Sequence, residues 1–180
     1  VYWTFKTIGH ENVSILNGGF KGWANGGNKV ATGENSITPA SFKTKLNKKY
    51  FASFSEVQKA QKGKGQQCLI DARPAAFFTG DKKHAKARIP GRLANARNLQ
   101  EGNLIDDSFK MKPSSAIKSQ FGGLDGVEQY KGYISYCNTG HWAATVWFGL
   151  SEIAQIPNVK MYDGGMTHWT SNPKRKVDLG

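Results

Sequence analysis

From residue 133 to residue 142 the chain reads Tyr133-Ile134-Ser135-Tyr136-Cys137-Asn138-Thr139-Gly140-His141-Trp142. The first four residues are typical of a buried β-strand, and the apolar residues after the stretch recur at the spacing of an amphipathic helix. A cysteine at such a junction lies beside helix N–H groups that lack partners, and these groups and the helix dipole favour negative charge. We therefore expect Cys137 to be held as the nucleophilic thiolate.

The loop that follows the cysteine has a composition suited to an anion. Gly140 allows the backbone to curl so that successive N–H groups point at the sulfur, which forms a nest for negative charge. The alternative is an ordinary buried cysteine that packs as a small hydrophobe, but Asn138, Thr139 and His141 are poor neighbours for that role. Cys68 is the opposite case, because it lies in an apolar run, and we expect it to be structural.

Strands and helices are expected to alternate on both sides of this loop. We predict strands at 41–50, 68–71, 93–96, 133–136 and 159–162, and helices at 55–61, 75–78, 113–121, 143–154 and 166–169. This alternation predicts an α/β fold with a central parallel sheet flanked by helices. Ligands of such sheets bind beyond the carboxyl ends of the strands, where Asp71, Arg73 and Cys137 are expected to meet.

Part of the sequence is repeated at a constant offset of 146 residues. Residues 12–23 and 158–169 share an asparagine, a valine, two glycines and a tryptophan at equivalent positions. Each copy predicts a short strand, a Gly-Gly turn and a turn of helix that buries its tryptophan. The first copy is therefore expected to form a strand at 13–16 and to bury Trp23.

This repeat predicts the organisation of the chain. It reads as the end of one module at 1–30, a linker at 31–40, a complete module at 41–172 and a basic tail at 173–180. A single strand at 13–16 needs a sheet to pair with. We therefore expect a companion polypeptide to complete the first module.

The charge balance favours a small anionic ligand. The 180 residues carry 25 Lys and Arg against 13 Asp and Glu, a formal net charge of +12, which concentrates anions near the surface. Nucleic acid is disfavoured, because the lysines are spread along the chain without an RNA-binding motif or a helix-turn-helix pattern. No apolar run is long enough to span a membrane. Residues 1–20 do not read as a secretory signal peptide, and the sequence is compatible with a cytoplasmic or a periplasmic location.

Metal and disulfide chemistry are both disfavoured by the sequence. Two cysteines are too few for a disulfide scaffold or a cysteine-rich metal site. The histidines His10, His84 and His168 show no metal-ligand spacing with one another or with Cys137. We therefore expect no metal site.

Several motifs together resemble the rhodanese sulfurtransferases. They are Leu69-Ile70-Asp71-Ala72-Arg73, Arg88-Ile89-Pro90-Gly91, the loop from Cys137 to Trp142, and Tyr162-Asp163-Gly164-Gly165-Met166 with Trp169. Residues 1–23 resemble the close of a preceding rhodanese domain. The resemblance implies a rhodanese-like α/β domain that follows the C-terminal piece of a second one. It also implies a thiosulfate sulfurtransferase that needs no metal or organic cofactor.

The resemblance also implies a role for each candidate residue. Cys137 would attack the outer sulfur of an anionic donor such as thiosulfate and carry it as a persulfide, which cyanide or a thiol acceptor would remove. The cradle for this sulfur would be formed by the rest of the loop: Asn138, Thr139, Gly140, His141 and Trp142. Arg73 and Arg88 would help to bind the donor. Arg73 alternatively forms a structural pair with Asp71 or a loop carbonyl, and Asp71 is expected to brace the loop.

Departures from the family pattern keep other functions open. Related phosphatases carry an arginine where this chain has Ala143, so phosphatase activity is disfavoured. The loop offers only His141 as a cation and ends at Trp142, which either packs or walls the pocket, and Phe77 stands where many two-domain members have an arginine. A 3-mercaptopyruvate sulfurtransferase is therefore an alternative, as is a sulfur carrier without turnover or a rhodanese-like binding module. The presence of Cys137 favours an active enzyme.

Overall fold

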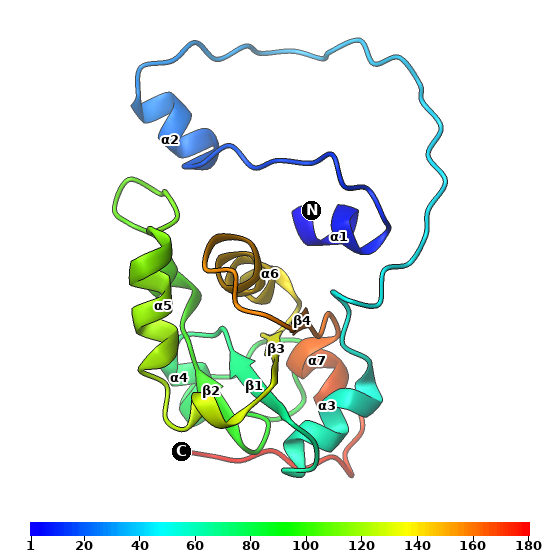
Figure 1. The fold of residues 1–180 in the computed structure, drawn as a ribbon, viewed down its shortest axis with the longest axis vertical. Coiled ribbons are helices and arrows are strands. Elements are labelled where there is room, and N and C mark those ends of the chain that lie inside the picture. Colours follow the sequence, from blue (N-terminus) through cyan, green and yellow to red (C-terminus); the bar gives the residue numbers. More distant parts are fainter.

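Four parallel strands form the central sheet of the computed structural model, which describes residues 1 to 180 (Figure 1). They are β1 (Gln67–Asp71), β2 (Ala96–Asn98), β3 (Gly132–Tyr136) and β4 (Val159–Met161), and they lie side by side in the order β2-β1-β3-β4. In the pairing of β1 with β3, Asp71 lies opposite Tyr136. Because the two strands run parallel, both end at the same edge of the sheet, and Cys137 directly follows the end of β3.

Helices cover both faces of this sheet. The α-helices are α1 (Tyr2–Thr7), α2 (Gly19–Asn25), α3 (Phe54–Gln61), α4 (Ala75–Thr79), α5 (Ser114–Gly122), α6 (His141–Phe148) and α7 (Gly165–Thr170). Two 3-10 helices, η1 (Glu101–Leu104) and η2 (Val127–Gln129), and a π-helical turn that continues α6, η3 (Gly149–Ile153), complete the list. Among these helices none combines the length and the hydropathy needed to cross a lipid bilayer.

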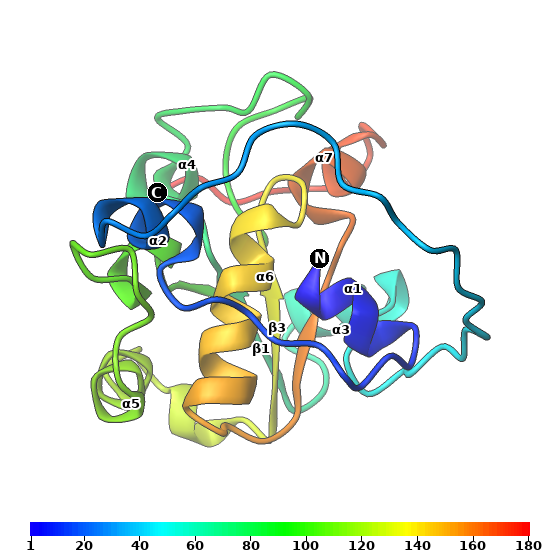
Figure 2. The ribbon, with the colours of Figure 1, turned by 90° about the horizontal axis from the view of Figure 1, so that it is seen from above.

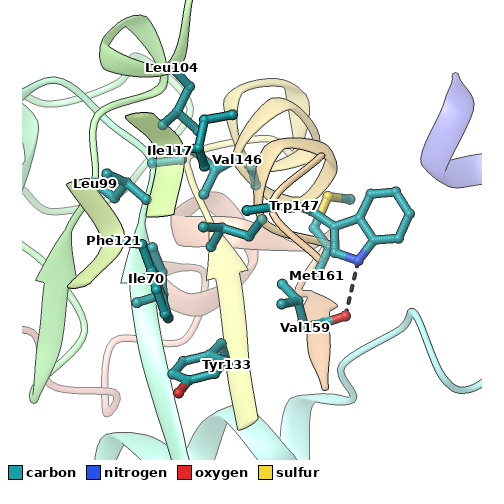
Figure 3. Close-up of a cluster of buried hydrophobic side chains, with 14 of the residues drawn as sticks. Ile70, Leu99, Leu104, Ile117, Phe121, Tyr133, Val146, Trp147, Val159 and Met161 are labelled. Carbon is teal, nitrogen blue, oxygen red and sulfur yellow. Dashed lines mark hydrogen bonds between the residues drawn. The ribbon is translucent and has the colours of Figure 1, made fainter. Parts of the chain in front are cut away.

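The two faces of the sheet carry separate hydrophobic clusters. Successive side chains of a strand point to opposite faces, so Ile70 enters the cluster with α5 and α6, whereas Leu69 enters the cluster with α3 and α7. In the first cluster, Trp147 of α6 is fully buried and donates its indole N–H to the carbonyl of Val159 at 3.0 Å (Figure 3). This packing fixes α6 against the sheet, and the predicted α/β fold with a parallel sheet is confirmed.

The N-terminal residues cross α6 and then run around the domain with little regular structure. α1 lies beside α6 (Figure 2), where the rings of Tyr2 and Phe148 have centres 5.0 Å apart. The indole N–H of Trp3 donates to the carbonyl of Tyr50 at 3.0 Å. Between α2 and α3 the chain forms no helix or strand apart from a single bridge at Phe51.

The predictions for the first repeat copy are partly wrong. α2 forms after the Gly-Gly turn, as expected, but residues 13–16 form no strand. Trp23 is 41% exposed, where burial was predicted. The reason is that no strand of the chain reaches this segment, so its backbone has no sheet to join and its tryptophan has no core to enter.

Two further strands differ in position from their predictions. Residues 41–47 are irregular, and pairing with β4 occurs only near Ala52, whose N–H donates to the carbonyl of Met161 at 2.9 Å. The strand predicted at 93–96 begins only at Ala96, because Asn95 takes a left-handed conformation with φ of 62° that interrupts an extended chain.

The C-terminal residues 173–180 lie against the α/β domain. The backbones of Arg92 and Asp178 exchange two hydrogen bonds of 2.9 Å, and the indole of Trp169 donates to the carbonyl of Lys176 at 2.9 Å. This segment therefore covers the loop that contains Gly91, whose carbonyl contributes to the site described below.

The start of α3 is fixed by a capping box and an ion pair. The hydroxyl of Ser53 accepts the N–H of Glu56 at 3.3 Å, and the carboxylate of Glu56 accepts the N–H of Ser53 at 2.8 Å. Lys160 of β4 donates to the same carboxylate at 2.6 Å. Burial raises the pKa of Glu56, but the hydrogen bonds from Lys160 and Ser53 outweigh burial and lower it below its ordinary value of 4.5.

This ion pair predicts a pH-dependent contribution to stability. Because the pKa of Glu56 is lower in the folded chain, its carboxylate stabilises the fold above pH 4.5, and this stabilisation is lost as the pH falls through the folded pKa. In urea unfolding, Glu56→Gln is expected to lower the free energy of unfolding at pH 7 and to match the wild type at pH values below the folded pKa. Glu34→Gln, at an exposed residue, serves as the control. An equal deficit of Glu56→Gln at both pH values would contradict the assignment.

Candidate active site

Cys137 lies between the end of β3 and the start of α6, as the sequence predicts. Its sulfur accepts a hydrogen bond from the backbone N–H of Gly140 at 3.1 Å, and the residue is only 1% exposed. Gly140 has φ of 91°, and a Cβ at this position would lie 2.9 Å from Oδ1 of Asp163. A glycine is therefore needed for the turn that brings this N–H to the sulfur.

The loop keeps other backbone donors without partners. The sequence predicted several N–H groups pointing at the sulfur, but only that of Gly140 donates to Sγ. Four more N–H groups of the loop donate to no acceptor in the chain, those of Asn138, Thr139, His141 and Trp142. Two of these donors, those of His141 and Trp142, belong to the first turn of α6, where N–H groups have no intrahelical partner. A loop with four N–H groups free of acceptors can receive one, and a developing negative charge suits such donors best.

The carbonyl side of the same loop is held by α7. The carbonyl of Cys137 accepts the N–H of Met166 at 2.8 Å. The carbonyl of Asn138 accepts the N–H of Thr167 at 3.2 Å and its hydroxyl at 3.0 Å. The motif around Gly164 and Gly165 was visible in the sequence, but a contact between two segments 29 residues apart had no local signal.

A buried ion pair lies next to the loop at the end of β1. Nη2 of Arg73 donates to Oδ2 of Asp71 at 2.6 Å and to the carbonyl of Gly91 at 2.9 Å, and both charged residues are at most 2% exposed. Burial opposes the charge of Arg73, but the hydrogen bonds and the attraction of Asp71 outweigh burial and raise the pKa of Arg73. A buried pair that keeps both partners is tolerated, whereas a lone buried charge is strongly destabilising.

Arg73 connects this pair to the loop rather than to solvent. Its Nη1 donates to Oδ1 of Asn138 at 3.4 Å. Because a guanidinium only donates, the oxygen of the Asn138 amide must face Arg73 and the nitrogen must face away. That nitrogen, Nδ2, is buried and has no hydrogen-bond partner. This geometry supports the structural alternative for Arg73, in which it pairs with Asp71 and braces the loop.

The remaining predicted site residues lie at the margin of the loop. His141 is exposed, with its Nδ1 3.2 Å from the hydroxyl of Thr139. Trp142 is half-buried and packs against Phe77 with ring centres 5.8 Å apart. Arg88 is exposed, and its guanidinium contacts none of the loop residues through a hydrogen bond. The structure therefore brings Asp71 and Arg73 to the loop, whereas Arg88 forms no hydrogen bond with it.

A cavity of about 610 Å³ adjoins the outer side of the loop. Its lining includes Thr139, Gly140 and His141 from the loop, together with apolar residues of the N-terminal segment and α6 such as Tyr2 and Phe148. No lysine or arginine lines it. The cavity therefore offers no lysine or arginine side chain to bind an anion. The sequence did not predict that residues of the N-terminal segment line a cavity beside the loop.

The second cysteine is chemically distinct from Cys137. Cys68 lies within β1, is 1% exposed, and its thiol donates only to the carbonyl of Leu69 at 3.7 Å. Burial raises the pKa of Cys68 to about 11. At neutral pH it is therefore a neutral thiol, which is the inert state of a buried structural cysteine.

Comparisons with known proteins place this geometry in a family. The family described as "Rhodanese-like domain" matches residues 53–172. The thiosulfate sulfurtransferase of Gallus gallus is 30% identical over 98% of this chain, and the 3-mercaptopyruvate sulfurtransferase of Escherichia coli K12 is also 30% identical over 98% of it. The sulfur carrier protein TtuD of Thermus thermophilus is 25% identical over 93% of the chain. The chain spans 60–62% of the lengths of these three relatives.

Solved structures support the same fold. The anaerobic ergothioneine biosynthesis enzyme from Chlorobium limicola, in complex with trimethyl histidine, superposes with a TM-score of 0.84 at 18% identity. The match covers 99% of this chain and 44% of that protein. The family match over 53–172, which is two thirds of the chain, shows that the chain belongs to the rhodanese-like domain family.

Proposed function

We propose that this chain transfers a sulfane sulfur from thiosulfate to cyanide or a thiol through a persulfide on Cys137. The observation that supports this most directly is the loop itself, in which one backbone N–H donates to Sγ and four others have no acceptor. The near-complete enclosure of Cys137 also keeps bulk water away from a reactive sulfur adduct. Neither step of the reaction requires a metal or an organic cofactor.

The proposed reaction proceeds in two balanced steps. In the first, the thiolate of Cys137 attacks the outer sulfur of thiosulfate, a new S–S bond forms, and the bond to the sulfonate sulfur breaks with its electron pair leaving on sulfite. In the second, cyanide attacks the outer sulfur of the persulfide, thiocyanate leaves, and the thiolate is restored. Donor and acceptor therefore bind in turn, which predicts ping-pong kinetics. The loop N–H groups stabilise the charge on the outer sulfur.

The identity of the donor is the finer part of this proposal. The loop contains no lysine or arginine, and Arg73 is committed to Asp71. A dianion such as thiosulfate would be attracted by the net charge of +12 and by exposed cations such as Arg88. The relatives named for 3-mercaptopyruvate and for sulfur carriage make these the alternatives. Steady-state rates with thiosulfate and with 3-mercaptopyruvate, each with cyanide as acceptor, distinguish the three functions, since a carrier is loaded once without turnover.

We also propose that a companion polypeptide completes the first module. The exposed apolar residues of the first copy include Ile15, Leu16 and Phe20. The N–H groups of Phe20 and Lys21, which are equivalent to the α7 donors that hold the cysteine loop, donate to no acceptor. An apolar strand-like segment followed by two free donors fits a rhodanese-like sheet and loop supplied by another polypeptide.

Substitution of each cysteine by serine tests whether Cys137, and not Cys68, carries the proposed sulfur transfer. Cys137→Ser is expected to lower the rate of thiocyanate formation by about 10⁴ or more, because the hydroxyl cannot form the persulfide. Cys68→Ser is the matched control, and its rate per folded molecule is expected to equal that of the wild type. Rates are measured with thiosulfate and cyanide, and urea unfolding gives the folded fraction. Sulfur transfer that persists in Cys137→Ser would overturn the mechanism.

Hydrogen exchange tests the companion polypeptide. In the isolated 180-residue chain, amides of residues 13–23 are expected to exchange fast, whereas those of the equivalent residues 159–169 exchange slowly because their sheet is complete. Mass spectrometry of proteolytic fragments after a timed pulse in heavy water gives both values in one sample. Equal protection of the two copies in a monomer would contradict the proposal.

A further inference from the structure

The orientation of two peptide groups in the cysteine loop is set by α7. The carbonyls of Cys137 and Asn138 both accept N–H groups of α7, from Met166 and Thr167. All peptide bonds of the chain are trans, and in a trans peptide the N–H points opposite to the carbonyl of the same plane. The N–H groups of Asn138 and Thr139 therefore point away from α7. These are two of the four loop donors that have no acceptor.

The approach of α7 to the loop depends on the absence of a side chain at Gly165. This residue has φ of 53°, and a Cβ there would lie 2.5 Å from the carbonyl oxygens of both Cys137 and Asn138. Both atoms belong to the backbone, so contact at that distance requires the loop to move. Any side chain at this position would therefore push on the two carbonyls that α7 holds.

The sequence repeat supplies a natural comparison for this glycine. Gly19 occupies the equivalent position of the first copy and has nearly the same conformation, with φ of 56°. A Cβ at Gly19 would meet no atom within 4 Å. A side chain at either glycine would be strained by the left-handed backbone, but only a side chain at Gly165 would also contact the cysteine loop.

We propose that Gly165 is a positioning residue for sulfur transfer, with Thr167 as its partner. Because Gly165 has no side chain, α7 can pack against the loop and fix the two peptide planes that follow Cys137. The N–H groups of Asn138 and Thr139 then point toward the outer sulfur of the proposed persulfide. Gly165 itself contacts neither donor nor acceptor. This role rests on the proposed sulfur transfer through Cys137. It identifies Gly165 and α7 as the part of the fold that orients the N–H groups of the cysteine loop.

Matched alanine variants at the two glycines test this role. Gly165→Ala and Gly19→Ala are compared in the full chain for kcat, KM and urea unfolding. Both are expected to lose some stability from the left-handed backbone. Only Gly165→Ala is expected to lower kcat, by about 10-fold to 100-fold, because it displaces donors that act on the transition state, with a smaller change in KM. A kcat for Gly165→Ala equal to that of Gly19→Ala would overturn the inference.

A milder pair of variants keeps the test decisive where Gly165→Ala fails to fold. Thr167→Val removes the hydroxyl that donates to the carbonyl of Asn138, and a kcat lower by about 3-fold to 10-fold is expected. Thr167→Ser retains the hydroxyl and is expected to restore kcat. Wild-type rates for Thr167→Val would overturn the inference while leaving the proposed function standing. An inactive wild-type chain would instead overturn the proposed function.

Discussion

The loop after β3 has backbone N–H groups that bond to no acceptor in the chain. The contacts of the neighbouring segments with this loop depend on that feature. Most backbone donors of a folded chain are paired, but four in this loop have no acceptor in the chain. Here the neighbouring segments bond to the other side of the loop instead. α7 binds its carbonyls, and Arg73, which is itself held by Asp71, binds the side chain of Asn138. The loop is thus held through the carbonyls of Cys137 and Asn138 and through the side-chain oxygen of Asn138, whereas four of its N–H groups have no acceptor in the chain.

The parallel sheet explains why these supports converge. β1 and β3 are central neighbours, so Asp71 at the end of β1, Arg73 just after it and Cys137 just after β3 lie at one edge of the sheet. β4 then leads into α7 on the same side. Three segments that are far apart in sequence therefore meet around one sulfur, and the fully buried Trp147 fixes α6 beneath them. The architecture leaves Cys137 enclosed, with its sulfur accepting a main-chain N–H, a contact that does not depend on side-chain identity.

Much of this arrangement was predictable from local signals. Continuous apolar runs predicted β1 and β3, and the spacing of apolar residues predicted α6. The position of Cys137 between β3 and α6 predicted a donor-rich loop. What could not be predicted depends on contacts between distant segments. The left-handed turn at Asn95 makes β2 begin later than predicted. Residues 13–16 have the apolar pattern of a strand but pair with no strand of the chain. The sequence left open whether Arg73 binds an anion or forms a structural pair. In the structure it hydrogen-bonds to Asp71 and Asn138.

In the proposed function, Cys137 accepts a sulfur atom and gives it up again. The most direct measurement is the mass of the proteolytic peptide that carries Cys137 after the protein is treated with thiosulfate under non-reducing conditions. One added sulfur, about 32 Da, is expected on that peptide, with no addition on the peptide that carries Cys68, and cyanide is expected to remove it. Unchanged mass at Cys137, or a sulfur adduct on Cys68 alone, would contradict sulfur transfer through Cys137.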